Sequence, residues 1–287
     1  MQGTTGQERC VLLWEAVDHW AARRPDAEAL VFEEERLTWR QFHAMVDAIA
    51  KAYLEIGVPA GGCVAMMAAA CNEFLPAFLA AAKIGAKWVG LSPKFTEDEI
   101  AQILSDCKPD VLIALREYRG NDFTEAGVRV VERLPSIRCV LMLDRMVDGA
   151  KLFRDYIAID RPERDAELEQ RQRAVQPGDP ALLMYTSGST GRPKGVVHTH
   201  TSIIASAATE VRQLELDEHT RVLLHFPINH VAADVEIGYT TVYMGGTVVH
   251  MDRFDPVASL EMMERERITL VGQVPTMCLM QMAAPLF

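Results

Sequence analysis

The residues best suited to chemistry lie in one stretch, Tyr185–Gly195, which reads Tyr-Thr-Ser-Gly-Ser-Thr-Gly-Arg-Pro-Lys-Gly. Glycines let the backbone turn sharply and approach a ligand closely, and the N–H groups of such a turn form a concavity that binds anions. Serine and threonine hydroxyls add hydrogen-bond donors or an oxygen ligand for a metal ion. Lys194 supplies a compact positive charge, and Pro193 stiffens the turn before it. This combination predicts a loop that binds a polyphosphate.

The neighbouring residues place this stretch between two strands. An apolar run at 181–184 predicts a buried strand before the loop, and Val196-Val197 predicts a second strand after it. The loop differs from the Walker A pattern, because Pro193 stands where that pattern requires glycine, and it lacks the Gly-x-Gly of a dinucleotide-binding turn. A flexible Gly/Ser linker is the alternative, but a linker is not expected to connect two strands tightly and to carry a Pro-Lys pair.

Composition and charge narrow the class of protein. The chain has 287 residues, of which 49% are hydrophobic and 24% charged, as in ordinary globular proteins. A net charge of −11 argues against sequence-independent binding of nucleic acid, which relies on a basic surface. The sequence offers neither an apolar run long enough for a membrane span nor a signal-peptide core at 1–10, which predicts a cytoplasmic protein. The six cysteines form no Cys-x-x-Cys pair and predict reduced thiols rather than a zinc site.

Strands and helices alternate along the first half of the chain. Helical periodicity and caps at Thr38 and Thr96 predict helices that are separated by short apolar runs, and these runs predict strands at 29–32, 64–67, 88–91, 111–114 and 138–142. Such alternation is typical of an α/β protein with a parallel sheet covered by helices. The charged stretch at 161–173 instead predicts a solvated connector that is at most partly helical.

A strand end in the second half supplies further candidate residues. The strand at 221–226 breaks at Pro227 and is followed by Asn229 and His230. Strand ends in α/β sheets face the ligand crevice, so this break is well placed for function, although Asn229 could equally cap a helix. The last segment predicts a helix whose methionines fill the core: Met277, Met280 and Met282.

Two histidines follow the loop closely. His198 and His200 would point in opposite directions on a strand, so a metal pair is not expected. His200 has two interpretations, a residue at the ligand end of the loop or a hydrogen-bonded structural histidine. Thr201 or Ser202 is expected to cap the helix that begins here.

The stretch Tyr185–Gly195 closely resembles the phosphate-binding signature of the adenylate-forming enzymes, which include acyl-CoA synthetases, amino-acid adenylation domains and luciferases. The turn at 226–230 resembles their substrate-side motif, in which an aromatic residue and proline precede a histidine, and Phe-Asp-Pro and Val-Pro-Thr-Met recur at 254–256 and 274–277. Gly61-Gly62 departs from the usual Gly-Asp, which we interpret as a surface change.

This resemblance implies a fold and a division of the chain. The implied fold is α/β with two packed, mostly parallel sheets, as in the large N-terminal domain of adenylate-forming enzymes, here truncated. Residues 1–175 would form a first α/β lobe with a connector. Residues 176–287 would form an incomplete lobe with the phosphate loop and the acyl pocket, and the C-terminal mobile domain would be absent.

The resemblance also implies a reaction, in which a carboxylic acid is activated with ATP and Mg²⁺ as an acyl-adenylate and then transferred to coenzyme A. Lys194 and His230 are implied as catalytic residues, and Thr186 as the metal-binding hydroxyl. The implied nucleotide-binding residues are Thr186, Ser187, Gly188, Ser189, Thr190, Gly191 and Lys194. The implied pocket for a fatty, alicyclic or aryl acid contains Asn229, His230, Val231 and Asp234.

Two other functions stay open at this point. An amino-acid or aryl-acid adenylation domain would load a carrier protein, but Phe226 is followed by Pro227 rather than by the aspartate usual in the amino-acid enzymes. A non-catalytic nucleotide-binding fragment is the second alternative, because the family's adenine and ribose motifs and its mobile lysine would lie beyond Phe287. We therefore expect residues 1–287 alone to have little adenylation activity, and the exposed sheet edge of such a fragment could promote a homodimer.

Overall fold

Two sheets organise the fold in the computed structural model, which describes residues 10–115, 117–118, 121–122, 134–186 and 193–285. One sheet has five strands in the order β14-β12-β13-β1-β2, and the other has seven in the order β11-β10-β4-β3-β5-β8-β9. The strands of the first are β1 (Glu28–Phe32), β2 (Glu35–Thr38), β12 (Arg221–Leu224), β13 (Thr247–His250) and β14 (Leu270–Val271). Those of the second are β3 (Cys63–Met67), β4 (Lys87–Leu91), β5 (Val111–Ala114), β8 (Cys139–Met142), β9 (Lys151–Leu152), β10 (Pro180–Thr186) and β11 (Lys194–Thr199).

Most neighbouring strands in both sheets are parallel. The exceptions are two hairpins, one between β1 and β2 and one between β10 and β11. A separate two-stranded ribbon joins β6 (Glu117–Tyr118) to β7 (Asn121–Asp122). The α/β class with two mostly parallel sheets is thus confirmed. Both sheets take strands from before and after residue 176, and the division into two lobes at that residue stays a prediction.

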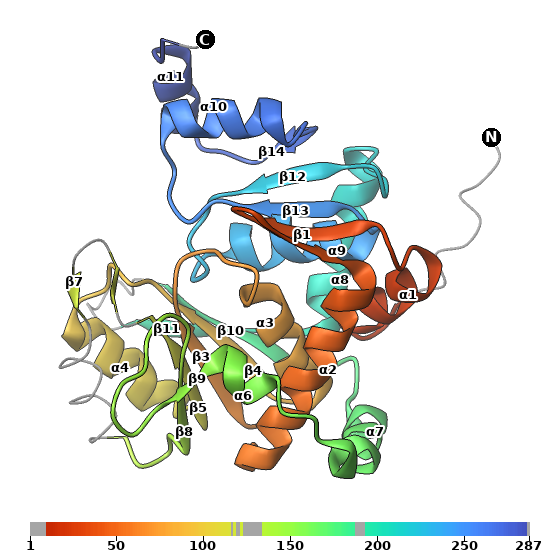
Figure 1. The fold of residues 1–287 in the computed structure, drawn as a ribbon, viewed down its shortest axis with the longest axis vertical. Coiled ribbons are helices and arrows are strands. Elements are labelled where there is room, and N and C mark those ends of the chain that lie inside the picture. The colour runs from red at the N-terminus through yellow and green to blue at the C-terminus, as the bar shows by residue number, and fades with distance from the viewer. Residues whose placement is uncertain (1–9, 116, 119–120, 123–133, 187–192, 286–287) are drawn as a thin grey trace.

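Helices fill the space between the sheets and cover their outer faces. Figure 1 shows α3, α8 and α9 between the two sheets, with α10 beyond the five-stranded sheet. The main core combines strand residues of both sheets with these inner helices, whereas α4 packs on the other face of the seven-stranded sheet. The helices are α1 (Glu15–Arg23), α2 (Trp39–Ile56), α3 (Phe74–Lys83), α4 (Glu97–Cys107), α6 (Phe153–Ile157), η1 (Pro162–Arg164), α7 (Asp165–Ala174), α8 (His200–Gln213), η2 (Ala232–Tyr239), α9 (Thr240–Met244), α10 (Pro256–Arg265) and α11 (Pro275–Met282).

Side-chain hydrogen bonds cap the N-termini of α2, α4 and α8. Thr38 and Thr96 each accept a hydrogen bond from the backbone three residues later and complete a capping box, which confirms both predictions. The cap of α8 is Thr199, whose hydroxyl accepts from Ser202 N at 3.2 Å. The prediction of Thr201 or Ser202 was wrong by a few residues, because the β11 strand leads directly into the helix.

The charged connector is more ordered than its composition suggested. It forms α7, in which Leu168 is buried, and the preceding Arg161 is only 2% exposed and paired with Glu55. Arg171 donates to the carbonyl oxygens of Ile84 and Val58. The expectation that this connector is at most partly helical was therefore wrong, because long arginine side chains bind backbone acceptors at the ends of α2 and α3 and hold the helix on the core.

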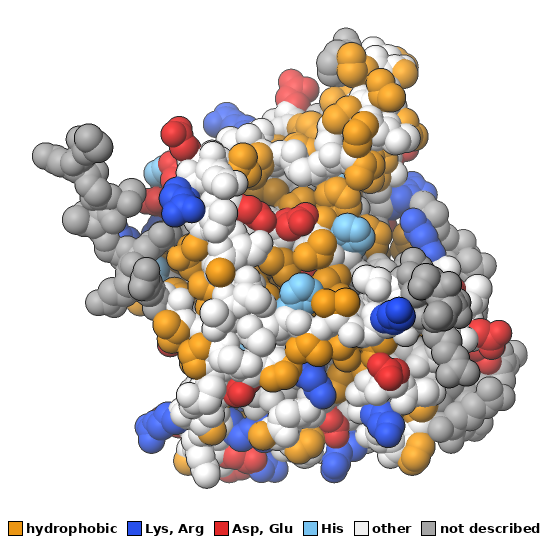
Figure 2. Space-filling model, turned by 180° about the vertical axis from the view of Figure 1, so that it is seen from behind, with side chains coloured by type: hydrophobic (Ala, Val, Ile, Leu, Met, Phe, Trp, Pro, Cys, Tyr) orange, Lys and Arg blue, Asp and Glu red, His pale blue; other side chains and the backbone are white. Residues whose placement is uncertain are grey.

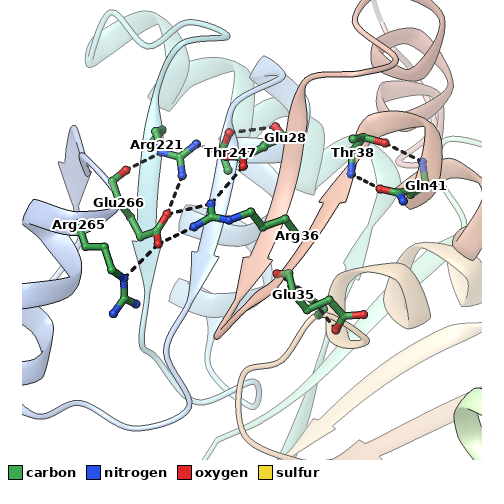
Figure 3. A network of polar contacts seen from close by, with 10 residues as sticks. Glu28, Glu35, Arg36, Thr38, Gln41, Arg221, Thr247, Arg265 and Glu266 are labelled. Atoms are coloured by element: carbon green, nitrogen blue, oxygen red, sulfur yellow. Dashed lines mark hydrogen bonds and ion pairs between the residues drawn. The ribbon is translucent and has the colours of Figure 1, made fainter.

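A network of charged residues fastens the five-stranded sheet to its outer helix (Figure 3). The buried carboxylate of Glu266, just after α10, accepts from Arg36 on β2 at 2.9 Å, Arg221 on β12 at 3.1 Å and Arg265 at 3.3 Å. Glu28 on β1 bonds both Arg36 and Arg221. The Glu266 carboxylate thus joins two strands to the end of α10, and the Glu28 carboxylate adds β1 to the network.

The final helix differs from its prediction. Figure 1 shows α11 projecting from the body of the molecule, and Leu279, Met280 and Met282 are 65%, 47% and 60% exposed. The expectation that these methionines fill a core is wrong for Met280 and Met282 in this structure. Within the described ranges, the helices are all too short or too polar to cross a membrane.

Candidate functional site

The predicted phosphate loop joins the two strands of the β10–β11 hairpin. The register pairs run from Pro180 opposite Thr199 to Thr186 opposite Lys194. Both residues of this last pair are exposed, and Lys194 has no ion pair with the part of the chain that the structure describes. The cradle residues Ser187, Gly188, Ser189, Thr190 and Gly191 lie outside the described residues. The hairpin therefore brings the predicted hydroxyl and ammonium groups together at one end of a strand.

Helix α4 holds the end of β10 in place. Tyr185, directly before Thr186, donates its hydroxyl to the Asp106 carboxylate at 2.5 Å. Burial together with this bond raises the pKa of the Tyr185 hydroxyl, so it stays a donor. The sequence analysis did not single out Asp106, because the contact joins residues from two separate elements.

The turn that carries His230 rests on the strand beside this hairpin. Gly90 on β4 lies so close to Ile228 that a Cβ added there would be 1.8 Å from the Ile228 carbonyl oxygen. Only glycine allows this approach, and the signal in the sequence was a glycine inside an otherwise bulky strand. Trp88 on β4 is paired with Leu182 on the parallel strand β10. Strand spacing and rise then place the Cα of Thr186 roughly 8 Å from that of Gly90.

His230 is exposed, and its ring is oriented by two neighbours. Its Nδ1 accepts from Ala232 N at 3.2 Å, and the ring stacks on Phe226 with 6.1 Å between centroids. With Nδ1 acting as an acceptor, the neutral ring carries its proton on Nε2 and presents a donor. Asn229 and Val231 are half-buried beside it. The η2 helix begins after Val231, and the cap predicted as the alternative role of Asn229 is not formed.

Asp234, the last predicted pocket residue, is completely buried in η2, a π-helix. Burial raises its pKa well above the usual value, and the Trp88 indole N–H lowers it only in part. Neither carboxyl oxygen has a partner in hydrogen-bond geometry among the residues described. Asp234 is thus a buried carboxyl inside η2 rather than a side chain exposed beside His230.

Two further histidines lie in or near this region. His200 is fully buried, its Nδ1 accepts from Leu13 N at 3.3 Å, and its ring packs edge-on against Trp14, so the interpretation as a structural histidine is correct. His225 lies just past the end of β12, and its ring stacks on that of Phe226 with 4.9 Å between the ring centroids. Burial lowers the pKa of both imidazoles to about 4, so both are neutral at pH 7. The sequence analysis did not single out His225.

Figure 2 shows one face of the molecule. Histidine side chains lie among hydrophobic ones in its middle, with acidic side chains close to them. No group of three or more metal-ligating side chains occurs within the described ranges. Thr186, exposed at the end of β10, offers one hydroxyl oxygen.

Comparisons with known proteins agree with this geometry. Residues 17–287 match the family described as AMP-binding enzyme. The chain is 30% identical over 274 residues to indoleacetate–CoA ligase of Aromatoleum aromaticum, covering 95% of this chain and 51% of that protein. It is also 30% identical over 243 residues to long-chain-fatty-acid–CoA ligase FadD13 of Mycobacterium tuberculosis, covering 84% of this chain and 44% of that protein.

A solved structure shares the fold. The anthranilate CoA ligase AuaEII, in complex with anthranoyl-AMP, superposes with a TM-score of 0.80 at 24% identity, over 94% of this chain and 51% of that chain. The chain spans about half the length of the curated relatives it matches. The match over nearly all of its residues shows that the chain belongs to the AMP-binding enzyme family.

Proposed function

We propose that this chain forms the nucleotide- and acid-binding part of an AMP-forming acid–CoA ligase. In this reaction a carboxylate attacks the α-phosphate of ATP, pyrophosphate leaves, and the thiol of coenzyme A then displaces AMP from the acyl-adenylate. The observation that carries the proposal is the Thr186–Lys194 pair at the end of the hairpin, beside the strand that supports the His230 turn. Relatives named as CoA ligases support the same reaction class.

The residues at the hairpin end fit a polyphosphate with its metal ion. ATP would supply the adenylyl group that converts a poor acyl donor into a reactive one, with pyrophosphate as the leaving group, and bound Mg²⁺ would neutralise phosphate charge. Lys194 would bind phosphate oxygens, because it is exposed and has no ion pair within the described part of the chain. Thr186 would donate its hydroxyl or bind the metal. Ser187, Gly188, Ser189, Thr190 and Gly191 would complete the cradle with backbone N–H groups.

The acid would lie near His230. The Nε2–H of this ring can donate to a carboxylate oxygen and hold the nucleophile in line with the phosphate. Half-buried Asn229 and Val231, with the stacked ring of Phe226, offer an apolar wall with one amide. This lining suits a fatty, alicyclic or aryl acid better than an amino acid, because Phe226, Asn229 and Val231 carry no charge that could pair with an ammonium group.

The deciding experiment is an assay of acid-dependent AMP release. The complete gene product is incubated with Mg-ATP, coenzyme A and a panel of fatty, alicyclic, aryl and amino acids, and AMP and acyl-CoA are measured together. Matched, CoA-dependent formation of both products supports the proposal. AMP formation without thioester on CoA points to a carrier-protein acceptor. ATP binding without AMP formation by any acid supports a non-catalytic nucleotide-binding role.

Activity of residues 1–287 alone is a separate question. The relatives that match this chain are about twice as long, and we propose that residues 1–287 bind Mg-ATP weakly and adenylate poorly. Calorimetry with Mg-ATP would measure the binding, and acyl-adenylate formation by these residues alone would contradict the second half of the proposal.

A further inference from the structure

Four aromatic rings follow one another from the segment before α10 to the turn that carries His230. The ring of His225 lies 5.5 Å from that of Phe254 and stacks on that of Phe226, with 4.9 Å between centroids. Phe226 in turn stacks on His230 at 6.1 Å, with the two ring planes 18° apart. Aromatic pairs prefer offset stacking at separations of this size. We call these four residues the ring row.

Backbone hydrogen bonds and a helix cap hold the buried end of the ring row. Met251 N donates to the Leu224 carbonyl oxygen at 2.8 Å, which fixes the end of β12 on β13 directly before His225. Phe254 directly precedes Asp255, whose carboxylate caps the N-terminus of α10. The ring row therefore starts from backbone that is fixed on both the sheet and its outer helix.

The other end of the ring row is exposed. His230 N donates to the Pro227 carbonyl oxygen at 3.1 Å, and this turn brings His230 beside Phe226. An exposed side chain can take several rotamers, and packing against a neighbour restricts the choice. A displacement of about 1 Å in a group that binds or orients a substrate can cost about a hundredfold in rate. Contact with Phe226 therefore matters for any reaction that uses the His230 Nε2–H.

His225 contributes to the ring row as a flat ring. It is 5% exposed, and neither of its nitrogens has a hydrogen-bond partner among the residues described. Buried polar groups without a partner cost stability, so these nitrogens do not explain a ring at this position by what they bond. Exchange of the imidazole for another ring would remove no described hydrogen bond, whereas loss of the ring would leave Phe226 without its closest stacking partner.

We propose that His225 is a positioning residue, which acts through Phe226 to hold the His230 ring where its Nε2–H can donate to the carboxylate of the acid. The inference rests on the proposed ligase function, because it concerns the placement of His230 against the acid. Since His225 is buried behind Phe226 in the ring row, it orients His230 without touching the reacting groups.

The test compares His225→Leu, which removes the ring, with His225→Phe, which keeps a ring, in the complete gene product. The probe acids are octanoate, cyclohexanecarboxylate and benzoate, and the one that the wild type converts fastest is used. His225→Leu should lower kcat/KM for this acid about tenfold while KM for ATP changes by less than about twofold. His225→Phe should recover most of the lost kcat/KM.

Phe42→Leu is the matched control. It also removes one ring of an aromatic pair, because Phe42 is fully buried on α2 with its ring 5.7 Å from that of Trp39. It should lower the melting temperature but retain kcat/KM for the acid. A loss of kcat/KM in Phe42→Leu equal to that in His225→Leu would show a general effect of destabilisation and overturn the proposal.

Double-mutant cycles test the route through Phe226 to His230. Phe226→Leu interrupts the ring row, so adding His225→Leu to it should cost no further kcat/KM. His225→Leu should likewise have no effect in a His230→Ala background. Wild-type kcat/KM in His225→Leu, equal losses in His225→Leu and His225→Phe, or additive losses in either cycle would each overturn the proposal.

A second variant keeps the test decisive if His225→Leu does not fold. Phe226→Leu, at a half-buried position, must then lower kcat/KM for the acid and have no further effect in the His230→Ala background. Losses that add in that background would overturn the proposal. A wild-type protein that releases no AMP with any acid of the panel refutes the ligase function instead.

Discussion

Thr186 and Lys194 are paired directly across the β10–β11 hairpin, at the last register position before the predicted phosphate loop. A hydroxyl and an ammonium group at the two ends of one loop can bind the same phosphate chain from both sides. The geometry depends on the hairpin, because a one-residue slip in register would turn one of these side chains to the opposite face of the sheet. The strand pairing thus determines the chemistry at this position.

Replacing Lys194 with alanine should lower kcat/KM for ATP by about a hundredfold, because loss of one preorganised charge or donor at developing negative charge has roughly this effect. Steady-state AMP release measures it. Lys87→Ala is the control. Lys87 begins β4, at the opposite end of the parallel strands from Thr186, and its replacement should change kcat/KM for ATP less than twofold. Equal losses of kcat/KM for ATP in Lys194→Ala and Lys87→Ala would argue against phosphate binding by Lys194.

Replacing Gly90 with alanine should displace the His230 turn. The added Cβ would be 1.8 Å from the Ile228 carbonyl oxygen, so the backbone must move. We expect a loss of about 1–3 kcal/mol in the free energy of unfolding, typical of overpacking, and a rise in KM for the acid. The control is Gly178→Ala, where an added Cβ meets nothing within 4 Å. Equal stability of the two variants would contradict the close approach.

The two strands of the hairpin could be predicted because their signals are local. Apolar runs, glycines and a Pro-Lys pair lie within a few residues of one another, and the capping threonines Thr38 and Thr96 are read in the same way. The contact between Gly90 and Ile228 joins segments far apart in sequence, so no local pattern specifies it. A glycine in a strand indicated that something approaches the backbone there, but not what.

The roles that the sequence left open for His200 and Asp234 depend on how deeply each side chain is buried. His200 could not be assigned from sequence because its hydrogen bond comes from Leu13, 187 positions away. Asp234 was predicted as a pocket residue from the family resemblance, and the structure places it fully buried inside η2. The charge pattern at 161–173 correctly indicated polarity but not that Arg171 would find backbone acceptors on the core. In each case a tertiary contact outweighed the local preference.

Replacing Tyr185 with phenylalanine should loosen the start of the phosphate loop. The lost bond to Asp106 is 2.5 Å long, and a hydrogen bond to a charged group contributes about 1.5–3 kcal/mol. KM for ATP should rise several-fold with kcat less affected, because the end of β10 that carries Thr186 would be held less firmly. Asp106→Asn keeps an acceptor for the hydroxyl and should show a smaller rise. Equal KM values for wild type and Tyr185→Phe would argue against this role.

His200 should make the folded state sensitive to acid. Burial lowers its pKa from 6.5 to about 4, so the unfolded chain takes up a proton in this range and the folded chain does not. Stability therefore falls as pH drops from about 6.5 to 4, by about 1.4 kcal/mol per unit at most. His200→Asn keeps an acceptor for Leu13 N but cannot titrate. Urea unfolding at pH 7 and pH 5 should show that this variant loses less free energy of unfolding than the wild type between these pH values. An equal loss in both proteins would contradict the assignment of acid sensitivity to His200.

Replacing Glu266 with glutamine should weaken the join between the five-stranded sheet and α10. Three arginines bond this buried carboxylate (Figure 3), and removing one member of a buried ion pair typically costs about 3 kcal/mol or more. Arg265→Ala removes only an exposed partner, 58% accessible in its side chain, and should change the free energy of unfolding by about 0.5 kcal/mol or less. Burial alone would raise the pKa of Glu266, but the hydrogen bonds from Arg36 and Arg265 and the charges of Arg36 and Arg221 hold it below its usual value. The stabilisation is then present at neutral pH and lost as pH falls through that lowered value, so Glu266→Gln should be the less acid-sensitive protein in chemical unfolding. A variant that is as stable as the wild type at pH 7 would show that these strands do not need the carboxylate to stay joined to α10.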